Sequence, residues 1–294
     1  MQIKEYQNYH EPQKHTSSDF PFNIYPCCIP RDFIQVSLHW HSEMELVVIK
    51  KGTGLVSVNL HTKTVSAGDI VCILPGQLHS IEQKEQERME YENILLQPSM
   101  LVSGEQDLCA SRYIFPLTSG KLSLERFITP ELIWYPEAAH CIYEIDQLSA
   151  LRPEGYQLAI KGWLFQFLFI LITNQKSKDS VSKISTNSLR KLKIILGYVE
   201  AHYNETITID QMAALTYYSK SHFMKFFKQH MGMGFTEYLN TYRLNIACSL
   251  LDSTEDTILD IAAQVGFDNP SYFNRMFKRK YQMTPKNYRF RYKL

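Results

Sequence analysis

The feature that most constrains this fold is a pair of short helices joined by a tight turn near the end of the chain. The first helix of the pair carries apolar residues at helical spacing, so one of its faces is apolar: Ile258, Ile261, Ala262 and Val265. Gly266 can supply the positive φ that ends a helix, and Asn269-Pro270 is typical of a helix start. This pattern predicts a helix-turn-helix, whose second helix reads base edges in the DNA major groove.

The second helix of the pair has one apolar and one polar-basic face. Phe273, Met276 and Phe277 form the predicted inward stripe. The opposite face carries the polar and basic residues: Ser271, Asn274, Arg275, Lys278 and Arg279. The competing interpretation is a helical hairpin whose basic face is only solvated.

A second copy of the pattern favours the DNA-reading interpretation. Ile209, Met212 and Ala213 begin an earlier apolar helix, and the segment 219–228 precedes 269–278 by fifty positions. Three of its residues match their counterparts in the later helix: Phe223 with Phe273, Lys225 with Arg275, and Phe227 with Phe277. Two such units predict one domain with two reading heads.

The last hundred or so residues resemble the DNA-binding domain of the AraC/XylS family of bacterial transcription regulators. The resemblance rests on Gly266-Phe267, residues 271–279, Thr284-Pro285, Tyr288-Arg289 and, in the linking segment, Arg243-Leu244. The chain departs from the family pattern at Gln282, where glycine is usual, and at Gly234-Phe235, which replaces Thr-Pro. Both departures follow a recognition helix, so they affect the local turn.

The outward faces of the two recognition helices supply the predicted DNA contacts. We expect the base edges to be read by Ser221, Met224, Lys225, Ser271, Asn274 and Arg275. Arg275 is the strongest of these candidates because a guanidinium group matches guanine with two hydrogen bonds. The phosphate contacts are expected from Lys220, Lys228, Lys278 and Arg279.

The charge distribution localises this function to one end of a chain of 294 residues. Residues 1–187 carry 16 Lys and Arg against 21 Asp and Glu, a net charge of −5, whereas residues 188–294 carry 15 against 9, a net charge of +6. A basic C-terminal domain predicts double-stranded DNA as its partner. The six scattered cysteines, and the absence of a signal peptide or a long apolar run, predict a soluble cytoplasmic protein without a membrane partner.

The N-terminal half changes to the two-residue period of strands. Residues 33–41, 43–49, 54–60 and 69–74 are predicted strands, separated by turn residues at 51–52, 61–63 and 67–69. Short antiparallel strands of this kind predict a small sandwich or barrel.

Within this half, the string from His39 to Glu45, together with Gly52, Gly68-Asp69 and His79, is similar to the paired motifs of cupin barrels. The resemblance implies that His39, His41, Glu45 and His79 point together into the barrel. Three interpretations remain: the four residues line a site for a small-molecule effector, which we favour; they bind a divalent metal ion; or they only hydrogen-bond within the barrel.

Two helices are predicted after the barrel, over 131–151 and 154–173, and the family resemblance implies a homodimer through the second. Trp163, Phe167, Leu168 and Leu171 are the expected interface, with packing against the barrel as the alternative. Residues 174–188 are polar and aperiodic, which predicts a linker. The predicted organisation is thus an all-β cupin barrel with helices (1–173), a linker (174–188) and an all-α domain with two helix-turn-helix units (189–294).

These observations predict a sequence-specific transcription regulator, not an enzyme, controlled by an effector such as a sugar or related metabolite. RNA polymerase is a further expected partner. The alternative is a metal-dependent cupin enzyme with a DNA-binding tail. The sequence leaves open the effector, the operator, the direction of regulation and the presence of a metal.

Overall fold

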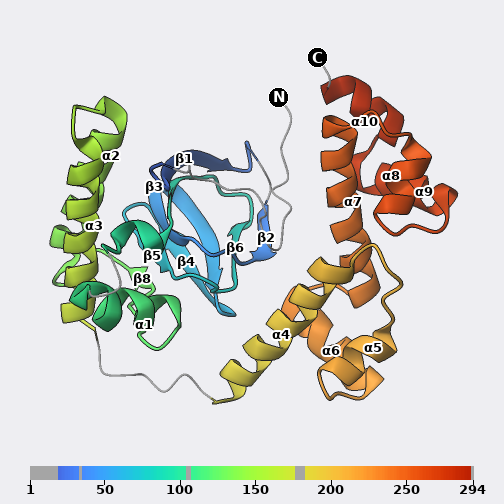
Figure 1. The fold of residues 1–294 in the computed structure, drawn as a ribbon, viewed down its shortest axis with the longest axis horizontal. Coiled ribbons are helices and arrows are strands. Elements are labelled where there is room, and N and C mark those ends of the chain that lie inside the picture. Colours follow the sequence, from blue (N-terminus) through green and yellow to red (C-terminus); the bar gives the residue numbers. More distant parts are fainter. Residues whose placement is uncertain (1–18, 33–34, 104–106, 176–182, 293–294) are drawn as a thin grey trace. The chain divides into compact units, whose positions relative to one another are not determined.

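The computed structural model describes residues 19–32, 35–103, 107–175 and 183–292, which form two compact units (Figure 1). The sensor unit is β-rich and ends with a helical hairpin, and the DNA-binding unit is helical throughout its described part. This division agrees with the predicted layout of a barrel domain followed by a helix-turn-helix domain.

The sensor unit is built on an antiparallel sheet organised around one long strand. Its eight strands are β1 (Phe22–Ile29), β2 (Gln35–His39), β3 (Met44–Val58), β4 (His61–Ser66), β5 (Ile70–Ile73), β6 (His79–Gln83), β7 (Met89–Leu96) and β8 (Phe127–Ile128). The first half of β3 pairs with β5 and β7, and its second half pairs with β4 and β6. The strand therefore belongs to both walls of the barrel.

Alternation along β3 separates two hydrophobic cores. Leu46 and Val48 face the helices that cover the sheet, whereas Val47 and Ile49 join the core inside the barrel. This is the two-residue period that the sequence predicts for a strand.

The predicted turn at Lys51-Gly52 is wrong, because β3 continues through it. The pairing of β3 with β7 shifts register between Ile49 and Lys51, and Gly52 adopts a positive φ of 74°. A Cβ on Gly52 would lie 1.8 Å from the carbonyl oxygen of Arg88, so glycine allows the neighbouring chain to approach. Residues 79–83 and 89–96, for which no strand is predicted, form β6 and β7. Residues 33–34 of the first predicted strand lie outside the described residues.

The helices of the sensor unit cover one face of the sheet. They are η1 (Pro98–Leu101), η2 (Ala110–Ile114), α1 (Phe115–Thr118), α2 (Tyr135–Leu151) and α3 (Tyr156–Thr173). Helices α2 and α3 form a hairpin (Figure 1). Arg152 and Gly155 adopt left-handed conformations, with φ of 47° and 79°, in the connection between them.

The predicted dimer face of α3 is wrong, because the domain core uses it. Phe167, Leu168 and Leu171 are buried, and Trp163 packs partly buried against the same core. Packing within the domain, the alternative left open by the sequence, is what occurs. Among the described residues, α3 is also the one helix long and apolar enough to cross a membrane by length and composition. Packing of one face against the sheet and α2 accounts for only part of that apolar character, because 33% of the helix is buried and Leu158 and Phe169 are exposed.

The DNA-binding unit consists of two small heads on one connecting helix. Helices α4 (Lys183–His202), α5 (Ile209–Leu215) and α6 (Lys220–Met231) form the first head; α8 (Ile258–Gln264), α9 (Pro270–Tyr281) and α10 (Pro285–Tyr292) form the second. Helix α7 (Phe235–Ser253) contacts both (Figure 1). Helix α4 begins at Lys183, so residues 183–188 of the predicted linker are helical, while 176–182 lie outside the described residues.

Both copies of the repeat form two helices with side-chain caps. Thr208 and Thr257 cap the first helix of each pair, and Ser219 and Asn269 cap the recognition helices α6 and α9. The first helices start at Ile209 and Ile258, 49 positions apart, whereas α6 and α9 start 50 positions apart. The second turn is therefore one residue longer.

Candidate functional site

The two recognition helices bury one apolar face each and expose the other. Phe223, Phe226 and Phe227 of α6 are buried, as are Phe273, Met276 and Phe277 of α9, which confirms the predicted inward stripe. The opposite faces carry all ten predicted DNA-contacting residues, and every one is exposed: Lys220, Ser221, Met224, Lys225, Lys228, Ser271, Asn274, Arg275, Lys278 and Arg279.

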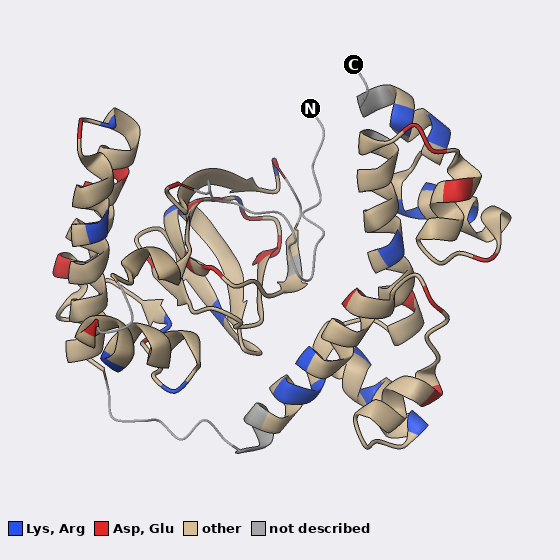
Figure 2. Cartoon of the chain, in the orientation of Figure 1, with Lys and Arg blue, Asp and Glu red and all other residues tan. Residues whose placement is uncertain are grey.

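Local contacts orient three of these exposed side chains. Lys220 forms an ion pair of 2.9 Å with Asp210, and Asn274 donates to the Pro270 carbonyl one turn earlier at 3.0 Å. The guanidinium carbon of Arg275 lies 5.3 Å from the Tyr272 ring centroid. Further basic residues lie on α4 and α10 (Figure 2). The DNA-binding unit therefore exposes basic side chains, which can contact phosphates, and two recognition helices, which can enter the DNA major groove.

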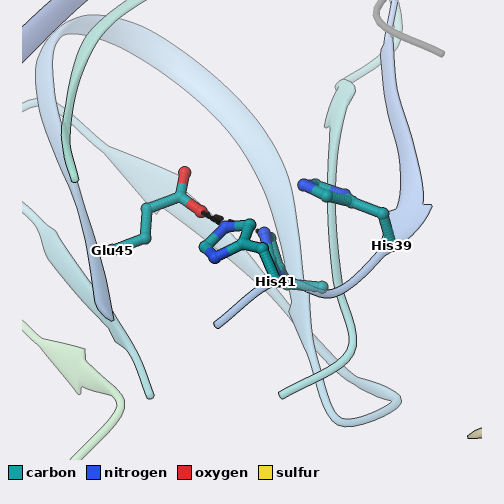
Figure 3. A group of neighbouring side chains, drawn as sticks. His39, His41 and Glu45 are labelled. Carbon is teal, nitrogen blue, oxygen red and sulfur yellow. Dashed lines mark hydrogen bonds and ion pairs between the residues drawn. The ribbon is translucent and has the colours of Figure 1, made fainter. Parts of the chain in front are cut away.

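The sensor unit holds a buried cluster of His39, His41, Glu45 and His79. His39 ends β2, His41 follows it, Glu45 lies on β3 and His79 begins β6. One potential ligand atom from each residue lies within 4.8 Å of the others, and each residue is at most 3% exposed. Figure 3 shows the Glu45 carboxylate extending to the imidazole of His41. The structure thus brings together all four residues that the sequence singles out.

The orientation of two imidazoles is set by backbone carbonyls. Nδ1 of His41 lies 3.2 Å from the Glu43 carbonyl oxygen, and Nδ1 of His79 lies 2.9 Å from that of Gln77. Because a carbonyl only accepts, each Nδ1 carries the proton. Nε2 of His41 and of His79 then face the same Glu45 oxygen, Oε2, at 3.0 and 2.9 Å.

This arrangement fits a cation at the centre of the cluster. With the proton on Nδ1, a neutral imidazole presents the lone pair of Nε2 to a carboxylate oxygen, which is repulsive. Either an added proton on Nε2 or a metal ion between the groups removes that repulsion. Imidazole and carboxylate are ligands that suit divalent first-row metals, and a backbone acceptor on Nδ1 is the usual support for a metal-binding histidine.

The electrostatics of Glu45 follow from the same contacts. Burial alone would raise the pKa of Glu45, but the imidazoles of His79 and His41 outweigh it and hold that pKa well below its usual value. Burial, with the nearby charge of Glu45, also raises the pKa of Cys27 to about 12. All six cysteines of the chain are free thiols, and Cys27 is protonated at neutral pH.

The sequence did not point to Glu43, whose buried carboxylate lies next to the His41 imidazole of the cluster. The residue is 5% exposed and its Oε2 lies 3.5 Å from Nδ1 of His41, while Gln97 donates to its Oε1 at 2.7 Å. Glu43 lies within the string from His39 to Glu45, but its partner Gln97 is 54 residues away in the sequence. Only the fold places the two together.

Comparison with known proteins identifies both units. A model of the AraC-like ligand binding domain matches residues 23–113, and a model of a helix-turn-helix domain matches residues 212–291. The chain is 28% identical over 286 residues to the HTH-type transcriptional regulator YdeC of Bacillus subtilis, and the match covers 96% of each chain.

Two further relatives match part of the chain. The regulatory protein PocR of Salmonella typhimurium is 32% identical over 127 residues, which is 42% of each chain. The solved DNA-binding domain of AdpA, a global transcriptional factor in complex with a target DNA, is 25% identical, with a TM-score of 0.34 over 35% of this chain and 92% of that one. The relatives are regulators, so the alternative of a cupin enzyme is not supported. The chain therefore belongs to the AraC family of transcription regulators, with an N-terminal ligand-binding domain and a C-terminal DNA-binding helix-turn-helix domain.

Proposed function

We propose that this regulator reads its operator with the exposed faces of α6 and α9 and is controlled by a small molecule bound at the His39–His41–Glu45–His79 cluster. The observation that carries the DNA-reading part is the repeated arrangement of a buried aromatic stripe and an exposed polar-basic face on both recognition helices. The protein acts in the cytoplasm, where it meets DNA and RNA polymerase.

The roles within each recognition helix follow from side-chain chemistry. Arg275 can donate two hydrogen bonds to a guanine, and Ser221, Met224, Lys225, Ser271 and Asn274 occupy the same outward faces. Lys220, Lys228, Lys278 and Arg279 contact phosphates, which position the protein without specifying sequence. The Asp210 partner of Lys220 must give way when a phosphate binds.

Selection of bound sequences from a random DNA library tests this proposal. The full chain should enrich a motif with two parts, one for each recognition helix. Lys225→Ala should blur one part and Arg275→Ala the other, because each removes contacts from only one helix. Enrichment of unrelated sequences, or the same profile for both variants, would contradict the assignment of these faces.

The effector part of the proposal rests on the burial and convergence of the four cluster residues. An effector that binds better to one arrangement of the two units shifts the equilibrium between arrangements. Glu45→Gln keeps the size of the side chain and should abolish the effector response while operator binding persists. A matched change of an exposed histidine on α2, His140→Gln, should leave the response intact. Loss of the response in both variants would contradict an effector site at the cluster.

A second candidate is a divalent metal ion held by the same four residues. The two Nε2 atoms that face one carboxylate oxygen favour it, because a metal ion between these groups is one of the two ways to remove their repulsion, the other being a proton on each Nε2. Elemental analysis of the purified chain, together with a thermal shift on adding Mn²⁺, Ni²⁺ or Zn²⁺, measures occupancy. Stabilisation by a metal at a thousand times its Kd is about 4 kcal/mol. If the wild-type chain binds effector but no metal ion, the effector site is supported and the metal site is refuted. If the wild-type chain binds a metal ion and Glu45→Gln abolishes that binding, the metal site is established.

Dimer formation is also part of the proposal, through the outer face of α3 in place of its buried face. Leu158, Gly162, Phe165 and Phe169 lie at spacings of four, three and four residues on the exposed side, which is the repeat of a coiled-coil seam. A Cβ added to Gly162 would meet no atom within 4 Å, so a partner helix can approach closely there. A second copy of the chain is the proposed partner.

Sedimentation of the full chain tests this dimer. Phe169→Glu should yield a folded monomer, because Phe169 is 58% exposed in the single chain, whereas Gln157→Glu on the same helix, away from this seam, should leave the dimer unchanged. The monomer should bind the operator more weakly by roughly 10²–10⁴, the gain expected from linking two binding domains. A dimer that survives Phe169→Glu places the interface elsewhere.

A further inference from the structure

The loop between α4 and α5 belongs to the first head by sequence but contacts the second head. Tyr203 packs against the hydrophobic core of the second head, and its ring centroid lies 5.5 Å from that of Tyr242 on α7. The loop is therefore a second connection between the heads, in addition to α7.

Arg243 of α7 holds this loop through its backbone. The side chain is buried, its Nε donates to the Tyr203 carbonyl at 2.7 Å, and its Nη2 donates to the Glu205 carbonyl at 2.6 Å. The guanidinium carbon also lies 5.8 Å from the ring centroid of Phe267, which lies in the turn of the second helix-turn-helix. One side chain thus contacts the loop of the first head and the turn of the second.

Gly266 brings the second turn directly against the same loop. It adopts φ 86°, and a Cβ built on it would lie 2.9 Å from three backbone atoms of Asn204. A methyl group there must displace backbone. Gly266 is thus needed both for its positive φ and for contact with the first head.

The second head is already fixed to α7 by other contacts. Asn240 donates to the Tyr272 hydroxyl at 2.9 Å, and Asn245 accepts from Lys280 and Tyr281, each at 2.9 Å. With that head rigid on α7, the loop 203–205, Arg243 and Gly266 stop the first head from turning about the helix axis. We name these residues the interhead clamp.

We propose that the interhead clamp sets the number of base pairs that this protein accepts between the two halves of its operator. This inference rests on the proposed reading of DNA by α6 and α9. One added base pair rotates the second half-site by roughly 35° and moves it by about 3.4 Å, because a helical turn has about 10 base pairs in 34 Å. Heads that cannot turn relative to each other cannot follow that displacement, so spacing becomes part of the specificity.

The test uses the full chain and operators with one or two base pairs added or removed between the two halves. Wild-type affinity should fall by about tenfold or more per base pair, the size of a single mismatch penalty. Gly266→Ala should reduce this spacing dependence while the base preferences within each half stay the same. Gly232→Ala is the matched control, because Gly232 has a similar φ of 71° but open space around its Cβ.

The outcomes separate this inference from the proposed function. If the wild-type chain binds no selected operator, the proposed function fails, and this inference fails with it. If it binds all spacings equally, only the clamp is refuted. The clamp is also refuted when folded Gly266→Ala retains the wild-type spacing dependence. Should Gly266→Ala not fold, Arg243→Lys decides, since it keeps the charge but cannot form both hydrogen bonds in the same geometry. Weaker binding at every spacing, with an unchanged ratio, contradicts the proposal.

Discussion

Replacing Phe167 with Ala should destabilise the sensor unit strongly, whereas the same change at Phe169 should not. Phe167 is fully buried in the core that α3 shares with the sheet and α2, while Phe169, two residues later, is 58% exposed. Phe→Ala in a core costs about 3–5 kcal/mol, and a surface change away from special features stays within about 0.5 kcal/mol. For a unit of this size, about 2–4 °C per kcal/mol converts the core value to a fall in Tm of roughly 6–20 °C.

Calorimetry of the full chain gives the Tm, and hydrogen exchange shows which of the two units has lost stability. Peptides from α3 and β3 should exchange faster in Phe167→Ala, while peptides from α9 in the other unit serve as an internal reference. The measurements belong at low protein concentration, because a dimer through the outer face adds stability that depends on concentration. Equal destabilisation by both variants at that concentration, or a Phe167→Ala chain that is stable but monomeric, would refute the assignment of the two faces.

Three further predictions concern separate parts of the molecule. Arg275→Ala should cost roughly 1–3 kcal/mol of DNA binding and relax the preference at one base position, whereas Lys278→Ala should weaken binding to all sequences alike, as measured by fluorescence anisotropy. Gln282 ends α9 in a left-handed conformation, with φ 58°. Gln282→Gly should therefore raise the free energy of unfolding of the DNA-binding unit by about 1 kcal/mol, measured by urea unfolding. A lower urea midpoint would mean that the hydrogen bond from the Gln282 side chain to the Arg279 carbonyl outweighs the backbone strain. Because the pKa of Glu45 is depressed in the folded state, its stabilising contribution is present above the unfolded pKa of about 4.3 and is lost as pH falls through the folded value. Glu45→Gln should therefore flatten the acid limb of the stability curve, and an identical acid limb in both chains would contradict the ion-pair account.

The sequence alone determined the elements whose signals are local. Helix periodicity and caps are set within a few residues: the predicted cap at Asn269 is confirmed, and Ser219 and Thr257 cap two further helices of the repeat. The resemblance to cupin motifs implied the cluster of His39, His41, Glu45 and His79, and the structure brings these four side chains together.

Tertiary structure decided the features that depend on distant residues. Helix α3 is apolar nearly all round, so periodicity could not tell whether Phe167 or Phe169 faces the core. The passage of β3 through Gly52 depends on the close approach of Arg88, 36 positions later in the chain. Glu43 has its role only because the fold brings Gln97 to it, and Arg243 recognises backbone carbonyls of Tyr203 and Glu205, which any residue type would supply. Contacts made to backbone or across long separations leave no pattern in the chain itself, and so only the packed structure could reveal them.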